Sequence, residues 1–192
     1  IQRDVEIYAR PKTRVRDYFV HAGLINDYTD GSFEVELSLQ NDTGGPVTEN
    51  VLVEIRNGEH VVYSQDGDIE LAAGHTDYTF ATTVPDVLQW SAEQPNLYSM
   101  TIRTSNETIS QSIGFRTAEI INGRFLINGK LVKLKGVNLH EHDEVTGHVV
   151  SEELMLEDIR LMKASNMNAV RNSHYPHQDG WYELVSRHGL YM

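Results

Sequence analysis

Length, composition and charge limit what this chain can be. Its 192 residues suffice for two modest domains, at least one of which can bury a sizeable core. With 16 basic and 28 acidic side chains, the formal net charge of −12 repels nucleic-acid backbones and anionic membrane surfaces. The absence of cysteine excludes thiol catalysis, disulfide bonds and cysteine-ligated metals, and no segment approaches the 18 apolar residues of a membrane span. We therefore expect no nucleic-acid partner and no membrane partner.

Residues 14–116 contain a series of short segments typical of β-strands. Apolar Phe33, Val35 and Leu37 alternate with polar residues, which is the period-two pattern of a strand with one buried face. Turn-forming sequences lie between segments, at residues 41–46, 57–58 and 66–67. The expected strands are residues 15–21, 33–40, 51–55, 60–63, 69–71, 78–84, 98–104 and 109–115. Seven or so strands of this kind over roughly 100 residues predict an antiparallel, immunoglobulin-like β-sandwich.

A different pattern begins after residue 115. Asn-Gly pairs at residues 122–123 and 128–129 lie on either side of an apolar segment and predict a hairpin, which an apolar run at residues 131–137 follows. Ser151 is the expected N-cap of a helix. The apolar stripe of this helix should comprise Leu154, Met155, Ile159, Leu161 and Met162. A second strand at residues 169–171, a second helix ending at Gly189 and a third strand from residue 190 should follow.

This alternation of strands and helices predicts a parallel sheet with right-handed crossovers. Two βα units and the start of a third cannot close an eight-stranded barrel, because strand number, tilt and shear are linked. The expected fold class is therefore mixed: an antiparallel immunoglobulin-like β-sandwich followed by the first βα units of a (β/α)8 barrel. We expect the chain to be a fragment of a larger catalytic domain.

Histidines follow the first expected parallel strand, at the position where barrel enzymes carry their chemistry. His140 and His142 are two residues apart and point the same way if the segment is extended. Three interpretations are open: a zinc site with a third ligand, a substrate contact by His140 that His142 supports, or solvated loop residues without a role.

The second parallel strand ends in Arg171, and His174 follows three residues later. Because Pro176 restricts Tyr175 to an extended conformation, this loop can hold His174 as a fixed hydrogen-bond donor, or His174 can simply tie down the loop. Arg171 should be buried and need a carboxylate partner, which is either catalytic or part of a structural ion pair.

Two further groups of residues are interpreted as structural and not as catalytic or sugar-binding. Glu141, Asp143 and Glu144 are too close in sequence to provide the opposed carboxyl groups of a glycosidase, roughly 5–10 Å apart, so we interpret them as loop charges. Residues 90–98 contain aromatic side chains that could stack on a sugar. A packed loop that leads into a sandwich strand is the favoured interpretation.

These motifs together resemble the bacterial β-galactosidases of glycoside hydrolase family 2. The resemblance rests on Gly-Val-Asn-Leu-His-Glu-His at residues 136–142, Asn-Ala-Val-Arg at 168–171, Ser-His-Tyr-Pro at 173–176, Trp-Ser-Ala-Glu at 90–93, Pro-Asn-Leu-Tyr at 95–98 and Arg-Asp-Val at 3–5. It implies three regions: the end of a preceding jelly-roll domain at residues 1–12, an immunoglobulin-like sandwich at 13–117, and the N-terminal part of a TIM-barrel catalytic domain at 118–192.

The resemblance also implies a function, the hydrolysis of terminal β-D-galactosides by a retaining mechanism. His140 and His174 are similar to the family's two histidines that contact the galactosyl ring and stabilise the transition state. Arg171 is similar to the arginine that orients the nucleophile, so the substrate-binding set is His140, His174 and Arg171. The two catalytic glutamates would lie beyond Met192, and the isolated chain should be inactive.

The same resemblance implies properties of the complete protein. Magnesium, with sodium as a second candidate, would bind to residues beyond Met192, so no metal ligand or cofactor is assigned within this chain. The complete protein should be a homo-oligomer of the bacterial cytoplasm or periplasm. Leu139 departs from the family, which has arginine or lysine there, and this weakens the sugar assignment. The alternatives are a non-enzymatic β-sandwich binding or scaffold module and a β-glucuronidase-like relative.

Overall fold

The structure is a computed structural model that describes residues 5–192. The chain forms two compact units. We call Tyr8–Leu88 with Leu97–Thr117 the sandwich unit, and residues 5–7 and Gln89–Asn96 with Ala118–Met192 the barrel unit. The strand expected at residues 3–5 begins outside the described residues.

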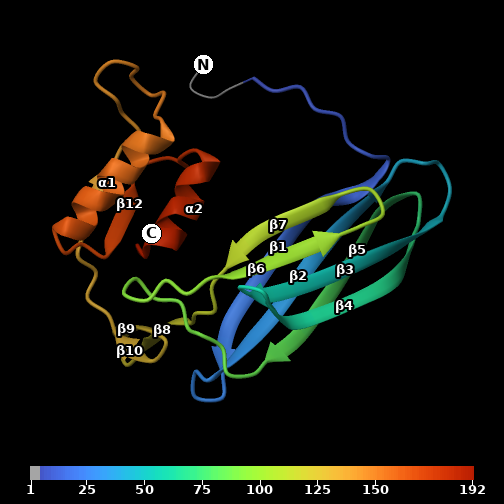
Figure 1. The fold of residues 1–192 in the computed structure, drawn as a ribbon, viewed down its shortest axis with the longest axis horizontal. Coiled ribbons are helices and arrows are strands. Elements are labelled where there is room, and N and C mark those ends of the chain that lie inside the picture. The colour runs from blue at the N-terminus through green and yellow to red at the C-terminus, as the bar shows by residue number, and fades with distance from the viewer. Residues whose placement is uncertain (1–4) are drawn as a thin grey trace. The chain divides into compact units, whose positions relative to one another are not determined.

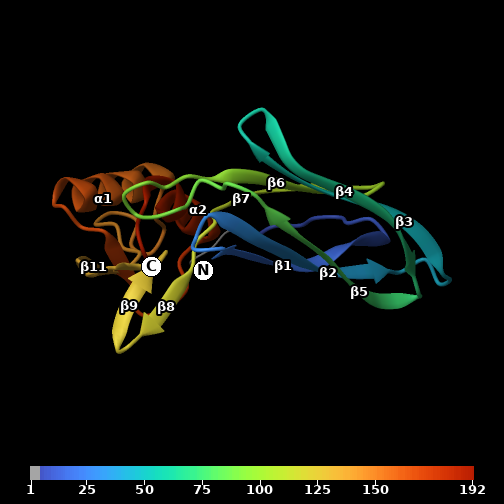
Figure 2. The same cartoon turned by 90° about the horizontal axis from the view of Figure 1, so that it is seen from below.

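The sandwich unit contains seven antiparallel strands within the described residues, which confirms the expected architecture (Figure 1). They are β1 (Thr13–Ile25), β2 (Asp30–Asn41), β3 (Val47–Asn57), β4 (His60–Leu71), β5 (Gly74–Val84), β6 (Tyr98–Arg103) and β7 (Thr108–Ile113). One sheet has the order β1-β2-β5 and the other β4-β3-β6-β7, and Figure 2 shows them as two layers.

The core of the sandwich lies between these sheets. Phe33, Val35 and Leu37 of β2 are buried, as their alternation predicts, and they belong to one apolar cluster with Val53 and Ile55 of β3. Burying a side chain of this size stabilises a fold by about 1.5–3 kcal/mol. The sandwich unit therefore has a closed core of its own.

One turn expected in the sandwich is wrong. Asp66 and Gly67 lie inside β4, where they pair with Leu52 and Val51 of β3, so the two strands expected at residues 60–63 and 69–71 are one strand. The pairing of β4 with β3 continues along the chain before and after this Asp-Gly pair, and the backbone hydrogen bonds of this ladder override the local turn preference of the pair. The turn expected at Gly58, whose φ is +57°, is confirmed.

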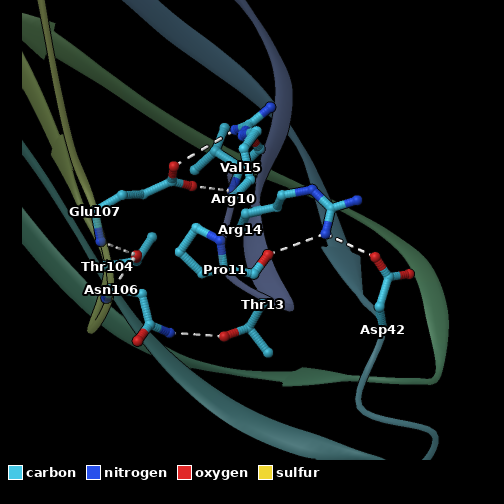
Figure 3. Close-up of polar contacts among 9 residues, drawn as sticks. All are labelled: Arg10, Pro11, Thr13, Arg14, Val15, Asp42, Thr104, Asn106 and Glu107. Carbon is cyan, nitrogen blue, oxygen red and sulfur yellow. Dashed lines mark hydrogen bonds and ion pairs between the residues drawn. The ribbon is translucent and has the colours of Figure 1, made fainter. Parts of the chain in front are cut away.

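The turn between β6 and β7 holds the beginning of β1 in place (Figure 3). The Glu107 carboxylate accepts hydrogen bonds from the backbone N–H of Val15 at 2.5 Å and from the Arg10 guanidinium at 3.4 Å. The Asn106 amide donates to the Thr13 hydroxyl at 2.8 Å. These bonds tie the edge strand β1 to a turn about 90 residues later in the chain.

The barrel unit begins with a small antiparallel sheet in the order β10-β9-β8, formed by β8 (Ala118–Ile121), β9 (Arg124–Ile127) and β10 (Lys130–Leu131). Asn122 and Asn128 have φ values of +50° and +52°, so both Asn-Gly pairs form turns, and the expected hairpin is confirmed. The apolar run at residues 131–137 is strand only at its two ends: Leu131 belongs to β10, residues 132–135 lie outside any strand, and Gly136 begins the next strand. The Asn168 side chain there bonds the carbonyl of Lys133 and the N–H of Lys135, in place of a neighbouring strand.

Two parallel strands follow, β11 (Gly136–Leu139) and β12 (Ala169–Asn172), and helix α1 (Glu152–Ala164) connects them. Helix α2 (Asp179–His188) comes next, and Tyr191 makes one parallel bridge to Ala169 where a third strand was expected. The predicted parallel βα pattern is thus confirmed. It argues against a stand-alone sandwich module, which has no use for parallel βα units.

The helices agree with the sequence pattern except at one position. Ser151 caps α1 by accepting a hydrogen bond from the N–H of Leu154 at 3.3 Å. Leu161 is 57% exposed, because it lies 200° around the helix from buried Ile159 at about 100° per residue. Gly189 ends α2 with a φ of +71°. The buried helical residues are Met155, Ile159 and Met162 of α1 and Trp181, Leu184 and Val185 of α2. Neither described helix is long and apolar enough to cross a membrane.

The loop Gln89–Asn96, between β5 and β6, belongs to the barrel unit. Trp90 is only 3% exposed, and its indole N–H donates to the Ser186 carbonyl at 2.8 Å. Its ring meets Tyr191 edge to face at 5.7 Å, and its carbonyl accepts from the Asn128 amide at 3.1 Å. The packed-loop interpretation is confirmed, because a buried Trp90 cannot serve as a sugar-stacking platform.

The two units should differ in hydrogen exchange. Amides of Val35 and Leu37, paired on both sides and buried, should exchange slowly. Amides of Lys133 and Leu134, which lie outside any strand in exposed chain, should exchange much faster. Exchange measured by NMR at two protein concentrations tests this, and equal protection in both segments at both concentrations would contradict it.

Removing the indole N–H of Trp90 should destabilise the barrel unit. Trp90→Phe leaves the Ser186 carbonyl without its indole donor, and we expect a loss of about 1–3 kcal/mol in the free energy of unfolding. Urea unfolding followed by the fluorescence of Trp181, the remaining tryptophan, measures the change. Leu88→Ala, at a half-exposed position of the sandwich unit, is the control and should leave this transition within about 0.5 kcal/mol.

Candidate active site

Parallel pairing of β11 and β12 brings two chain segments to one sheet edge. Leu139 pairs with Asn172, so His140 and the Ser173-His174 pair follow at neighbouring positions. The imidazole centroids of His140 and His174 lie 5.7 Å apart with an angle of 90° between the rings. The Ser173–His174 peptide bond is cis. The structure therefore brings together two histidines that are 34 residues apart and leaves both side chains exposed.

Arg171 lies beside Asn138 in the parallel register, and both residues line an open hollow of about 930 Å³ together with His174. Within this chain, Arg171 is exposed at the strand end, so the burial expected for its guanidinium is not seen here. Among the residues that the structure describes, no carboxylate forms an ion pair with it. As a residue that lines the hollow, Arg171 can bind a carboxylate that enters there.

The remainder of the hollow is mostly apolar. Its lining includes Leu134, Val137, Val170 and Tyr182, and no aspartate or glutamate of the described chain lines it. Leu139 packs instead against the helical core cluster, on the side of β11 that faces α1. The position at which this chain departs from the family pattern thus points away from the hollow.

The geometry does not support the zinc interpretation of His140 and His142. The ring of His142 meets that of His148 at 5.8 Å, and His140 meets His174 instead. Within residues 5–192, the one group of three metal-ligand side chains that lie close together is His21, Glu34 and Glu36, on β1 and β2 of the sandwich unit. The barrel unit, as described, does not gather three such ligands.

Glu141 is not the loop charge that the sequence suggested. It is only 4% exposed, and its Oε1 accepts a hydrogen bond from the backbone N–H of Gln178 at 2.7 Å. Its own N–H donates to the Tyr175 hydroxyl at 3.0 Å, and its carbonyl lies 2.6 Å from His148 Nδ1. The available sequence signal was the start of α2 at residue 179, since helix N-termini favour carboxylates.

Asp143 behaves as a structural loop residue. Its Oδ1 accepts hydrogen bonds from the N–H groups of Val145 and Thr146 at 2.8 and 2.7 Å, and from the Thr146 hydroxyl at 2.9 Å. These bonds, led by that from the Thr146 N–H, lower the pKa of the Asp143 carboxyl below its ordinary value of 3.8. Asp143 therefore closes its own turn, which agrees with its interpretation as a loop charge.

Comparison with curated proteins gives relatives along the whole chain. The β-galactosidase of Priestia megaterium is 38% identical over 203 residues, which cover 100% of this chain and 20% of that protein. The β-galactosidase of Streptococcus thermophilus is 36% identical over 197 residues, which cover 100% of this chain and 19% of that protein. This chain therefore spans about a fifth of the length of these relatives.

Solved structures share the fold. A β-glucuronidase of Parabacteroides merdae matches with a TM-score of 0.81 and 23% identity, over 94% of this chain and 23% of that one. A β-galacturonidase of Eisenbergiella tayi, bound to galacturonate, matches with a TM-score of 0.80 and 25% identity, over 94% of this chain and 32% of that one.

Two family models cover nearly all of the chain. The model described as glycosyl hydrolases family 2 matches residues 13–116, and the model described as glycosyl hydrolases family 2, TIM barrel domain, matches residues 118–192. Together with the antiparallel sandwich and the parallel βα units, these matches show that the chain belongs to glycosyl hydrolases family 2.

Proposed function

We propose that this chain contributes the substrate-contacting edge of a retaining β-galactosidase. The observation that carries the proposal is the His140–His174 pair, two exposed imidazoles 5.7 Å apart where two parallel strands end. This is where barrel enzymes place their active sites. The pair occurs in a chain that is 35–38% identical to proteins named β-galactosidase.

His140 and His174 have the chemistry that sugar recognition needs. An imidazole donates or accepts hydrogen bonds, and a pair of rings set at 90° can address two different hydroxyl groups of one pyranose. Donors held at fixed positions stabilise the charge of an oxocarbenium-like transition state more than they stabilise bound substrate. These two residues are therefore assigned to transition-state stabilisation and substrate binding.

Arg171 is assigned to the orientation of a catalytic carboxylate. Arg171 lines the hollow together with Asn138 and has no ion pair with a carboxylate of the described chain, and a guanidinium binds carboxylates with two parallel hydrogen bonds. Retaining hydrolysis needs two carboxyl groups about 5–5.5 Å apart, one as acid and one as nucleophile. Since no carboxylate of residues 5–192 lines the hollow, both would come from other parts of the catalytic domain.

A galactoside is the favoured substrate over a glucuronide. The curated relatives that match along the whole chain at 35–38% identity are named β-galactosidase. Magnesium, which the family resemblance implies for the complete protein, stays a prediction for residues beyond Met192, and we derive no step through it. The homo-oligomeric state of the complete protein also stays a prediction.

Grafting tests the proposed activity. Residues 1–192 replace the matching segment of the Priestia megaterium β-galactosidase, and we expect the graft to hydrolyse 2-nitrophenyl β-D-galactoside. The 192-residue chain alone should not, because it has no proton donor and nucleophile at working separation. A graft that unfolds cooperatively at a temperature close to that of the relative, yet has no turnover, would contradict the proposed function.

In the same graft, His174→Ala should lower kcat and kcat/KM together by about 100-fold, which corresponds to about 2.7 kcal/mol of lost transition-state stabilisation. Steady-state kinetics measure the change, and His75→Ala, at an exposed position of the sandwich unit, serves as control. An increase in KM at unchanged kcat would show that His174 binds ground state and transition state equally.

A further inference from the structure

We propose that Glu141 and Tyr175 are positioning residues, which lock the loop after β11 to the loop after β12 and thereby set the angle between His140 and His174. The inference rests on the proposed function for its catalytic consequence, but its structural part stands on the hydrogen bonds and ring contacts below.

Glu141 joins the loop after β11 to the loop after β12 and makes hydrogen bonds through three different groups. Its N–H reaches the Tyr175 hydroxyl at 3.0 Å in the loop after β12. Its carboxylate accepts the N–H of Gln178 at 2.7 Å, and its carbonyl lies 2.6 Å from Nδ1 of His148. A residue held at its N–H, its carbonyl and its side chain has little freedom to rotate. The backbone of His140, its immediate neighbour, is fixed with it.

The carboxylate of Glu141 lies in a place that favours a negative charge. Gln178 is the N-cap residue of α2, and its own side chain makes no cap hydrogen bond to the helix. Instead, the Glu141 carboxylate accepts the Gln178 N–H, at the helix end where the macrodipole is positive. A 4% exposed carboxylate without such a donor would be costly, because burying an unpaired charge is unfavourable. Burial and bonding together indicate a structural task for this group.

The ring of Tyr175 contacts histidines of both loops. The ring centroid lies 5.9 Å from that of His140, 6.4 Å from that of His148 and 5.5 Å from that of buried His177. His177 in turn lies 5.7 Å from Trp181, which is buried in the helical core. A continuous series of rings therefore runs from the exposed His140 to the core of α2.

Both histidines thus depend on the same two residues. Tyr175 directly follows His174 in the chain, and its hydroxyl holds the residue that directly follows His140. Loss of this hydrogen bond would free the two loops, and with them the two imidazoles, to move relative to each other, although both rings stay chemically unchanged. A displacement of about 1 Å in a catalytic group can cost about 100-fold in rate.

Three variants test the proposal at two levels. Tyr175→Phe removes the hydroxyl and keeps the ring, Glu141→Ala removes the carboxylate, and Glu141→Gln keeps an oxygen that can accept from Gln178. Asp143→Asn, in the adjacent turn, and Tyr78→Phe, in the sandwich unit, are matched controls. Each change is made in the isolated 192-residue chain for NMR and in the β-galactosidase graft for kinetics.

In the isolated chain, we expect the nuclear Overhauser contacts between the His140 and His174 rings to weaken in Tyr175→Phe and Glu141→Ala. They should persist in Glu141→Gln and in both controls. In the graft, kcat should fall about 10–100-fold in the first two variants while KM changes less than about threefold, and Glu141→Gln should restore most of kcat.

NMR of the isolated chain tests the positioning role, whereas kinetics of the graft also depend on the proposed function, so the two proposals can fail separately. If the graft is inactive throughout but the ring contacts respond as expected, positioning stands and the proposed function fails. If Glu141→Ala does not fold, Tyr175→Phe, which changes one hydroxyl only, decides alone. Unchanged ring contacts in a folded Tyr175→Phe chain would overturn the positioning role, as would a Glu141→Gln variant as impaired as Glu141→Ala.

Discussion

The candidate site depends first on the parallel pairing of β11 with β12. Parallel neighbours end at the same sheet edge, so two loops separated by a helical crossover emerge side by side. The pairing needs a close backbone approach at its beginning. A Cβ atom on Gly136 would lie 2.3 Å from the Ala169 carbonyl oxygen, which only glycine avoids. From this contact the register runs through Asn138 and Arg171 to the ends of both strands, and it decides which side chains meet beyond them.

The loop Gln89–Asn96 adds a long-range constraint to the same unit. The Lys163 ammonium donates to the carbonyls of Ala92 at 3.0 Å and Gly189 at 2.9 Å, and so joins this loop to the ends of both helices. Gly189 combines a φ of +71° with a backbone approach in which a Cβ would lie 2.4 Å from the Ala92 oxygen. In the sequence, the loop lies between β5 and β6, and these two strands contribute to the core of the sandwich unit. The sequence therefore does not divide cleanly at residue 117, because the barrel unit also includes the earlier segment Gln89–Asn96.

Local signals predicted most elements, and long-range contacts account for the errors. Alternation located β2, and the Asn-Gly pairs located the hairpin of β8 and β9, because both signals act within a few residues. The turn expected at Asp66 failed because pairing with β3, which is specified elsewhere in the chain, decides that backbone. At the candidate site, the sequence placed His140 and His174 after neighbouring strands, as the structure does, but it did not indicate the exposure of Arg171 in this chain or the burial of Glu141. An open hollow sets the environment of Arg171, and the start of α2 sets that of Glu141. The residues next to them in the sequence indicate neither feature.

The polar residues of the site divide by burial, and the division follows from what each task requires. Groups that meet a ligand must be open to solvent, and His140, His174 and Arg171 are exposed. Groups that hold others in place are more rigid when buried, since hydrogen bonds strengthen as water is excluded. Glu141 and His177 are buried directly behind the exposed histidines. Such burial is stable only where the polar groups are bonded, which explains why Glu141 uses its N–H, its carbonyl and its carboxylate. The exposed edge can thus present fixed donors because Glu141, next to His140 in the chain, has its hydrogen bonds already made.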